Sequence, residues 1–259
     1  MFITNVSEQI LANGLSISKS NVLIDQVPTI TDAGIGETPA NISSPDHSLN
    51  YTCGSSTVNF EVSYGAQTNI SYVGISGHTA TTPNQATIEL WNGATKIDQV
   101  ILKRNNNIMF TFASQSFSDL IVKFITVPVT YQMTVSYICA GQHLTILTGE
   151  QAGYKRAWLN RHTISKTTTN LQVAPVSTLQ KTKALKGSLS FPNELATFAE
   201  NDWQDFIDFS FEQPFFIKEQ QNKPESSYIC YDPMHDIVSH GQTRTLDVIK
   251  LKFTAYNGL

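Results

Sequence analysis

Two short segments of the chain contain the residue types that catalysis most often uses. The segment Gly74–His78 places Ser76 near His78, but no third side chain is marked that would orient the histidine for nucleophilic catalysis. We interpret this segment as a strand end with turning glycines. The stretch from Asp232 to His240 gathers two carboxylates and two imidazoles, a composition that suits a metal ion. The favoured interpretation is a polar connection between strands.

Carboxylates also recur between residues 200 and 212, where a pair of acids would suggest glycoside cleavage. On a helix, however, Asp202, Asp205 and Asp208 lie near one face, opposite an apolar stripe, which favours a solvated surface. The chain lacks the GxGxxG, Walker, GxSxG and HExxH motifs. We therefore expect no catalytic, cofactor-binding or metal-ligating residue, and no enzymatic activity.

Aromatic side chains give the one candidate binding surface. Exposed aromatic rings on a β-sandwich are a common platform for sugar rings, and Trp91 and Tyr72 are the candidate carbohydrate contacts, with Tyr131 and Tyr137 weighed beside them. The alternative is that these rings belong to the core, as most aromatic side chains do.

Composition excludes several classes of function. The chain has 259 residues, a formal net charge of -4 and only 15% charged residues. A surplus of Lys and Arg is needed to bind nucleic acid, so we expect no nucleic-acid partner. No apolar run is long enough to span a membrane as a helix, and no secretory signal is visible, so we expect no membrane partner and synthesis in a cytoplasm. Cys53, Cys139 and Cys230 are expected to be buried free thiols.

The elements that position these residues are predicted to be mostly strands. From Thr57 to Ile138, short segments rich in β-formers alternate with turn residues, and Val58, Phe60 and Val62 show the period of two that is typical of a half-buried strand. The pair Asn92-Gly93 predicts a tight hairpin. Strands at this spacing predict a jelly-roll β-sandwich over residues 22–145.

Alternation lapses between Gly141 and Gly153, and a second unit follows. Strands are predicted over 154–164, 167–173 and 183–191, and an amphipathic helix from Asn193 to Asp208 that buries Trp203 and Phe206. The predicted organisation is all-β with this one helix: an N-terminal segment 1–21 that packs with the C-terminal domain or with a partner, the jelly roll 22–145, and a C-terminal β-rich domain 146–259.

Five short motifs follow one another along the chain: Tyr72–His78, Ala86–Trp91, Trp203–Phe206, Gln213–Ile217 and Phe253–Leu259. In this order they resemble tail and baseplate structural proteins of long-tailed bacteriophages, of the distal-tail or minor-tail kind with a galactose-binding-type jelly roll. At Gln213 similar proteins commonly have an arginine, so an ionic contact there is not expected.

The resemblance implies a structural function in a virion tail. It implies a subunit of the tail tip or baseplate that is made in the host cytoplasm, forms a homo-oligomeric ring and contacts other phage tail proteins. It supplies no catalytic residue and no cofactor. The alternative is a carbohydrate-binding or receptor-binding module of a tail fibre, which would contact a host surface glycan through the jelly roll.

Overall fold

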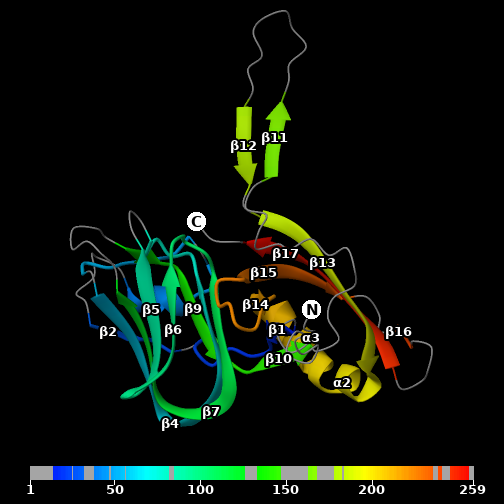
Figure 1. The fold of residues 1–259 in the computed structure, drawn as a ribbon, viewed down its shortest axis with the longest axis horizontal. Helices are drawn as coiled ribbons and strands as arrows, with labels where there is room; N and C mark the ends of the chain where they lie inside the picture. Colours follow the sequence, from blue (N-terminus) through cyan, green and yellow to red (C-terminus); the bar gives the residue numbers. More distant parts are fainter. Residues whose placement is uncertain are drawn as a thin grey trace, which may run out of the picture.

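The computed structural model describes residues 14–24, 26–31, 38–46, 48–55, 57–81, 85–125, 133–146, 163–167, 178–182, 184–235, 239–240 and 246–256. Its elements are almost all antiparallel strands, so the all-β prediction is confirmed (Figure 1). The jelly roll consists of β2 (Thr29–Ile30), the 3-10 helix η1 (Pro39–Ser43), β3 (Tyr51–Thr52), β4 (Thr57–Ser76), β5 (Ala86–Asn92), β6 (Thr95–Leu102), β7 (Ile108–Ile125), β8 (Thr134–Val135) and β9 (Tyr137–Gly141).

The long strands β4 and β7 take part in both layers of the jelly roll. Residues 57–63 of β4 pair with 119–125 of β7 in an outer layer, which β2, β5 and β6 extend. Residues 72–75 pair with 108–111 in an inner layer, which β9 completes. Register shifts between these two paired regions mark bulges, which bend strands and let one strand turn from one layer to the other.

Local sequence signals account for the outer layer. Val58, Phe60 and Val62 point into the jelly-roll core, as their alternation predicts. The hairpin between β5 and β6 is also confirmed: Asn92 pairs with Thr95, and Gly93 has a φ of 53°, a left-handed conformation that favours glycine.

The second unit is a sheet with the strand order β10-β1-β14-β15-β17-β13, to which β16 is added beside β17. The elements are β1 (Leu15–Ser18), β10 (His143–Ile146), β13 (Ala184–Leu195), α2 (Ala196–Glu200), α3 (Asp202–Glu212), β14 (Phe215–Lys218), β15 (Ser227–His235), β16 (Ser239–His240) and β17 (Leu246–Tyr256). Strand β1 comes before the jelly roll in the sequence and β10 comes after it, and the two pair with each other. Strand β10, which begins two residues before the predicted domain boundary, belongs to this second sheet.

The predicted amphipathic helix is present, but its limits are shifted. Strand β13 continues to Leu195, so Asn193 does not cap the helix, and helical structure runs from Ala196 to Glu212 in two segments that meet at Asn201. Ladder pairing of β13 with β17 overrides the capping signal. Trp203 and Phe206 are buried in the core between α3 and the sheet, as predicted.

The inner layer of the jelly roll is buried on both faces. Val73 and Ile75 point into the jelly-roll core, whereas Tyr72 points the other way, into a junction cluster with Tyr137 and Phe216. This junction cluster contains Tyr72, Met109, Tyr137, Cys139, Phe216 and Ile229. The two units therefore share a packed apolar interface, and all three cysteines are buried free thiols, as expected.

Strands β11 (Thr163–Thr167) and β12 (Thr178–Thr182) pair with each other in a separate hairpin. Figure 1 shows this hairpin projecting from the body of the molecule, before the start of β13. Most of the strand predicted over 154–164, and most of that over 167–173, lies outside the described residues. No helix among the described residues is long and apolar enough to cross a membrane.

Candidate functional site

The serine and histidine of the Gly74–His78 segment have separate structural roles. The hydroxyl of Ser76 donates a hydrogen bond to Asn107 Oδ1 at 2.9 Å, and His78 Nε2 lies 2.6 Å from the carbonyl oxygen of Asn106. His78 is buried, and burial lowers the pKa of its imidazole to about 4. The pair does not form a nucleophile and base.

The residues between Asp232 and His240 do not assemble a metal site in the described part of the chain. His235 contacts the hydroxyl of Ser210 at 3.0 Å and packs against the rings of Trp203 and Phe206, and Asp236 lies outside the described residues. No group of three possible metal ligands occurs among the residues that the structure describes.

The acidic face of the helix is solvated, as its spacing indicates. Asp205 and Asp208 are exposed, and Asp202 accepts a hydrogen bond from Lys19 Nζ at 2.8 Å in an ion pair. Such exposed pairs contribute little to stability. We find no buried carboxylate pair on this helix.

The two candidate sugar contacts have different environments. Tyr72 is fully buried in the junction cluster, where its hydroxyl donates to the carbonyl oxygen of Ser20 at 2.6 Å, so it presents no ring to a ligand at the surface. Trp91 is half-buried; its indole N–H donates to Glu89 at 3.1 Å, and Lys96 Nζ lies 6.0 Å from the ring centroid. A sugar contact at Trp91 stays a prediction. Tyr131 lies outside the described residues.

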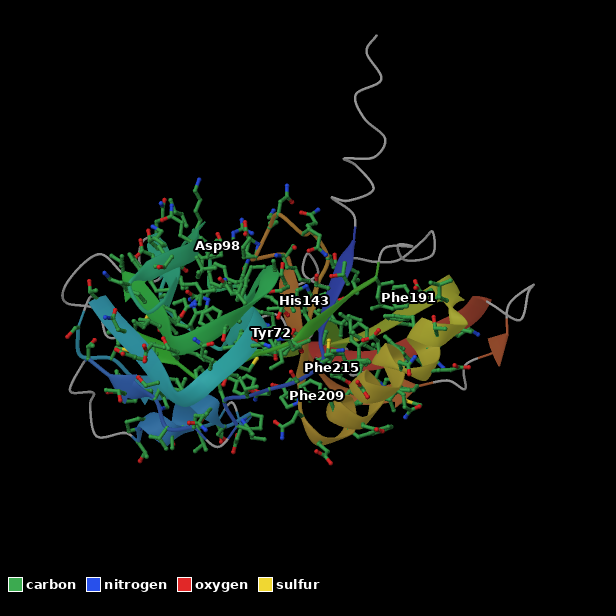
Figure 2. All side chains as sticks on the ribbon, turned by 90° about the horizontal axis from the view of Figure 1, so that it is seen from below. Tyr72, Asp98, His143, Phe191, Phe209 and Phe215 are labelled. Carbon is green, nitrogen blue, oxygen red and sulfur yellow. The ribbon has the colours of Figure 1, made fainter. Side chains whose placement is uncertain are left out.

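An open depression of about 400 Å³ lies at the junction between the inner layer and the second sheet. Figure 2 shows His143, one of its lining residues, in this region between the two units. The lining combines four segments of the chain: Ser71 of β4; Thr111, Phe112, Ala113 and Ser114 of β7; Gln142 and His143 at the start of β10; and Gln221 in the β14–β15 connection.

The polar groups of this depression are fixed by hydrogen bonds to the scaffold. The side-chain amide nitrogen of Gln221 donates to the carbonyl oxygen of Gly14 at 2.9 Å and to Ser16 Oγ at 2.8 Å. The side-chain amide oxygen of Gln221 then remains to accept a hydrogen bond from a ligand. The amide nitrogen of Gln142 donates to the carbonyl oxygen of Asn69 at 2.7 Å. These amides are therefore oriented before any ligand arrives.

His143 is neutral at physiological pH and is held by Ser71. The Ser71 hydroxyl lies 2.8 Å from His143 Nδ1 and accepts the backbone N–H of the same histidine at 3.0 Å. Burial, with a further contribution from Lys218, lowers the pKa of His143 to about 4. When the Ser71 hydroxyl donates to Nδ1, the ring carries its hydrogen on Nε2 and is a hydrogen-bond donor.

The depression therefore offers neutral donors and acceptors beside an apolar surface from Phe112 and Ala113. None of its described lining residues is a carboxylate, so the hydrogen-bonded pair Ser71 and His143 has no acidic group in this lining that would complete a catalytic triad. Such a lining suits the hydroxyl groups of a polyol or sugar, which both donate and accept.

A second open depression, of about 530 Å³, lies where the loop after η1 meets the end of α3 and the bend in β15. It differs in charge, because Asp46, Glu212 and Asp232 line it. Phe211, which is 66% exposed, also lines it. The two depressions therefore favour ligands of different charge.

Sequence reasoning missed the first depression because its residues are ordinary Ser, Thr, Gln and His side chains from four distant segments. The sequence held one signal of an unusual environment near it. The run Phe215-Phe216-Ile217-Lys218 places a lysine at a position where alternation predicts a buried side chain, and this lysine contacts the lining residue Thr111.

Comparison with known proteins gives likenesses of fold alone. No protein-family model and no curated protein sequence matches the chain. Among solved structures, the chain is similar to a chitosan-binding module from a chitosanase/glucanase of Paenibacillus sp. IK-5, with 12% identity, 48% of this chain and 99% of that one covered, and a TM-score of 0.37.

Two further structures show the same kind of likeness. A fucose-binding module of Streptococcus pneumoniae is 8% identical, with 47% of this chain and 94% of that chain covered and a TM-score of 0.39. A fucosidase of Ruminococcus gnavus is 12% identical, with 49% of this chain but 27% of that chain covered and a TM-score of 0.41. These comparisons do not show a bacteriophage tail protein.

Proposed function

We propose that this chain is a glycan-binding protein and that the depression at the junction holds the sugar. The observation that carries the proposal is the lining itself, in which preoriented neutral donors and acceptors surround the small apolar surface of Phe112 and Ala113. Sugars present hydroxyl groups at their edges and C–H groups on their faces, so both kinds of lining are used. We expect binding without cleavage, because none of the described lining residues is a carboxylate, the group that glycoside hydrolysis uses in pairs.

The test is a glycan array followed by titration of the strongest ligand. Ala113 is exposed in the depression, so Ala113→Gln fills the space without disturbing the core. We expect this variant to lose at least tenfold in affinity, and recovered oligosaccharide to contain no new reducing ends. The matched control is Ser118→Gln, the same introduced side chain at an exposed position of β7 outside the depression.

A third variant separates this proposal from the sequence-based prediction. If Trp91→Ala abolishes binding while Ala113→Gln leaves it unchanged, the sugar sits on β5 and the depression is not the site. If no glycan binds the chain at all, the proposed function is refuted.

The second candidate function is the tail-tip or baseplate subunit that the sequence motifs suggest. The observation that favours it is the projecting β11–β12 hairpin, whose strands pair only with each other among the described residues (Figure 1). An isolated two-stranded hairpin is marginally stable in water and leaves unpaired backbone groups on both edges, so a second copy of this chain is a suitable partner.

Native mass spectrometry tests this candidate. We expect a closed homo-oligomer, as in a ring, that becomes a monomer when residues 163–182 are replaced by a short Gly-Ser loop. Glycan binding should survive that replacement, because none of the described lining residues of the depression belongs to the hairpin. A monomer at every concentration, absent from virions, would refute the ring.

A further inference from the structure

Lys218 ends strand β14 and points its side chain toward the jelly roll. Side chains alternate along this strand: Phe215 and Ile217 enter the core under the helix, while Phe216 enters the junction cluster. Lys218 follows on the same side as Phe216 and is only 1% exposed. Its Nζ donates to the hydroxyl oxygen of Thr111 on β7 at 2.7 Å.

This ammonium group is under-satisfied. It has three N–H donors, yet within the described residues it makes one hydrogen bond and no ion pair. Asp98 and Glu225 act on it electrostatically from beyond ion-pair distance, and desolvation outweighs them, lowering the pKa of Lys218 to about 8. The group is therefore mostly charged at pH 7, and no described carboxylate lies within ion-pair distance of it.

Thr111 connects this cation to the depression. Thr111 lines the depression, and its hydroxyl oxygen accepts from Lys218, so the hydroxyl hydrogen is left to donate. Among the described lining residues, His143 is the one with a titratable side chain near neutral pH, it is neutral at pH 7, and none of them is a carboxylate. A positive charge behind a wall of neutral dipoles gives the depression a positive potential.

We propose that the depression selects glycans that carry a carboxylate, and that Lys218 supplies this selectivity through Thr111. The proposal rests on the proposed glycan-binding function and names its ligand class, the acidic sugars. Lys218 acts as a specificity-determining residue: its field favours the anion, and the Thr111 hydroxyl donates to it in a charge-assisted hydrogen bond.

The experiment uses the full chain and pairs of oligosaccharides that differ only in the oxidation state of C6. This carbon is a hydroxymethyl group in one member of each pair and a carboxylate in the other. Such pairs isolate the charge, because linkage and length are the same. We expect the acidic member of a pair to bind roughly tenfold more tightly at pH 7, which corresponds to about 1.4 kcal/mol. The ratio should fall as pH rises through about 8, the pKa of Lys218.

Two variants assign the effect. Lys218→Met keeps the apolar stem and removes the charge, and Thr111→Val removes the connecting hydroxyl with little change in shape. Both should bring the acidic-to-neutral ratio close to one, because each removes a group that favours the acidic member of the pair. Circular dichroism and thermal melting show whether each variant is folded, and Thr111→Val provides the test if Lys218→Met is not.

The outcomes are distinguishable. Equal binding of acidic and neutral members by the wild type, or an unchanged ratio in a folded Lys218→Met variant, overturns the selectivity and leaves glycan binding in place. Binding of sulfated but not carboxylated sugars overturns the carboxylate assignment. Absence of binding to every glycan removes the proposed function and the selectivity together.

Discussion

A single methyl group at Gly74 tests how tightly the two units are packed. Gly74 lies in the inner layer, and a Cβ added there meets Cδ2 and Cε2 of Phe216 at 2.8 Å each and the Cys139 sulfur at 2.9 Å. Phe216 is fully buried and stacked on Tyr137, with ring centroids 6.5 Å apart and an interplanar angle of 17°. The ring therefore has little room to move away.

The magnitude follows from two opposing effects. Overpacking a filled interface destabilises a protein by about 1–3 kcal/mol. Replacing glycine by alanine stabilises it by about 0.4–1 kcal/mol, because the unfolded chain has less conformational entropy. We expect Gly74→Ala to lower the free energy of unfolding by about 1–2 kcal/mol, a fall in melting temperature of a few degrees for a chain of this size.

Urea unfolding and a double-mutant cycle check the mechanism. Phe216→Leu alone destabilises the protein by opening a cavity, but it makes room for the methyl group, so the double variant should be less destabilised than the sum of the two single variants. Gly93→Ala is the control. Nothing lies within 4 Å of an added Cβ there, and the variant is destabilised only by the backbone φ of 53°. Its change in unfolding free energy should therefore be additive with that of Phe216→Leu. An unchanged or raised unfolding midpoint in Gly74→Ala would refute the close packing of the junction.

Three further predictions concern the buried groups. Trp203→Ala should lower the free energy of unfolding by about 3–5 kcal/mol in urea titrations, because the indole is 1% exposed and its ring centroid lies 4.8 Å from that of Phe206. The control Phe211→Ala, at a 66% exposed position, should change the free energy of unfolding by less than about 1 kcal/mol. The folded-state pKa of His78, about 4, lies below its unfolded value, so the unfolded chain binds more protons and stability should fall as pH drops from 6.5 toward 4. That shift corresponds to at most about 3 kcal/mol, and a His78→Gln variant should show a smaller fall in unfolding midpoint over the same range. The folded-state pKa of Lys218, about 8, is also below its unfolded value, so wild-type stability should rise from pH 8 to 10, and a Lys218→Met variant that shows the same rise would contradict this assignment.

The sequence was sufficient to predict the elements whose signal is local. Alternation along Val58, Phe60 and Val62, and the turn at Gly93, depend on neighbours in the chain, and the structure has both where they were predicted. The start of the helix was misplaced because the cap signal at Asn193 is local, while the pairing that extends β13 to Leu195 involves a strand about fifty residues away.

The candidate site was not predictable in the same way. Tyr72 was a candidate sugar contact with burial in the core as the alternative, because the sequence does not show which face of its strand it occupies or that a second sheet covers that face. The depression depends on the relative placement of β4, β7 and β10 and the β14–β15 connection, which no spacing along the chain encodes. The lysine at the end of an apolar strand was the one visible signal of a special environment.

The pairing of β1 with β10 makes the jelly roll an insertion into a host domain. Ser18 and His143 are Cα partners, so the chain leaves the host sheet and returns to it one strand spacing apart. Joining these strands by a two-residue turn would give an ordinary hairpin and leave the rest of the host sheet continuous. Another domain could therefore be inserted between β1 and β10 in place of the jelly roll. It would have to pack apolar side chains against Phe216 and Ile229 of the second sheet, which the jelly roll now buries.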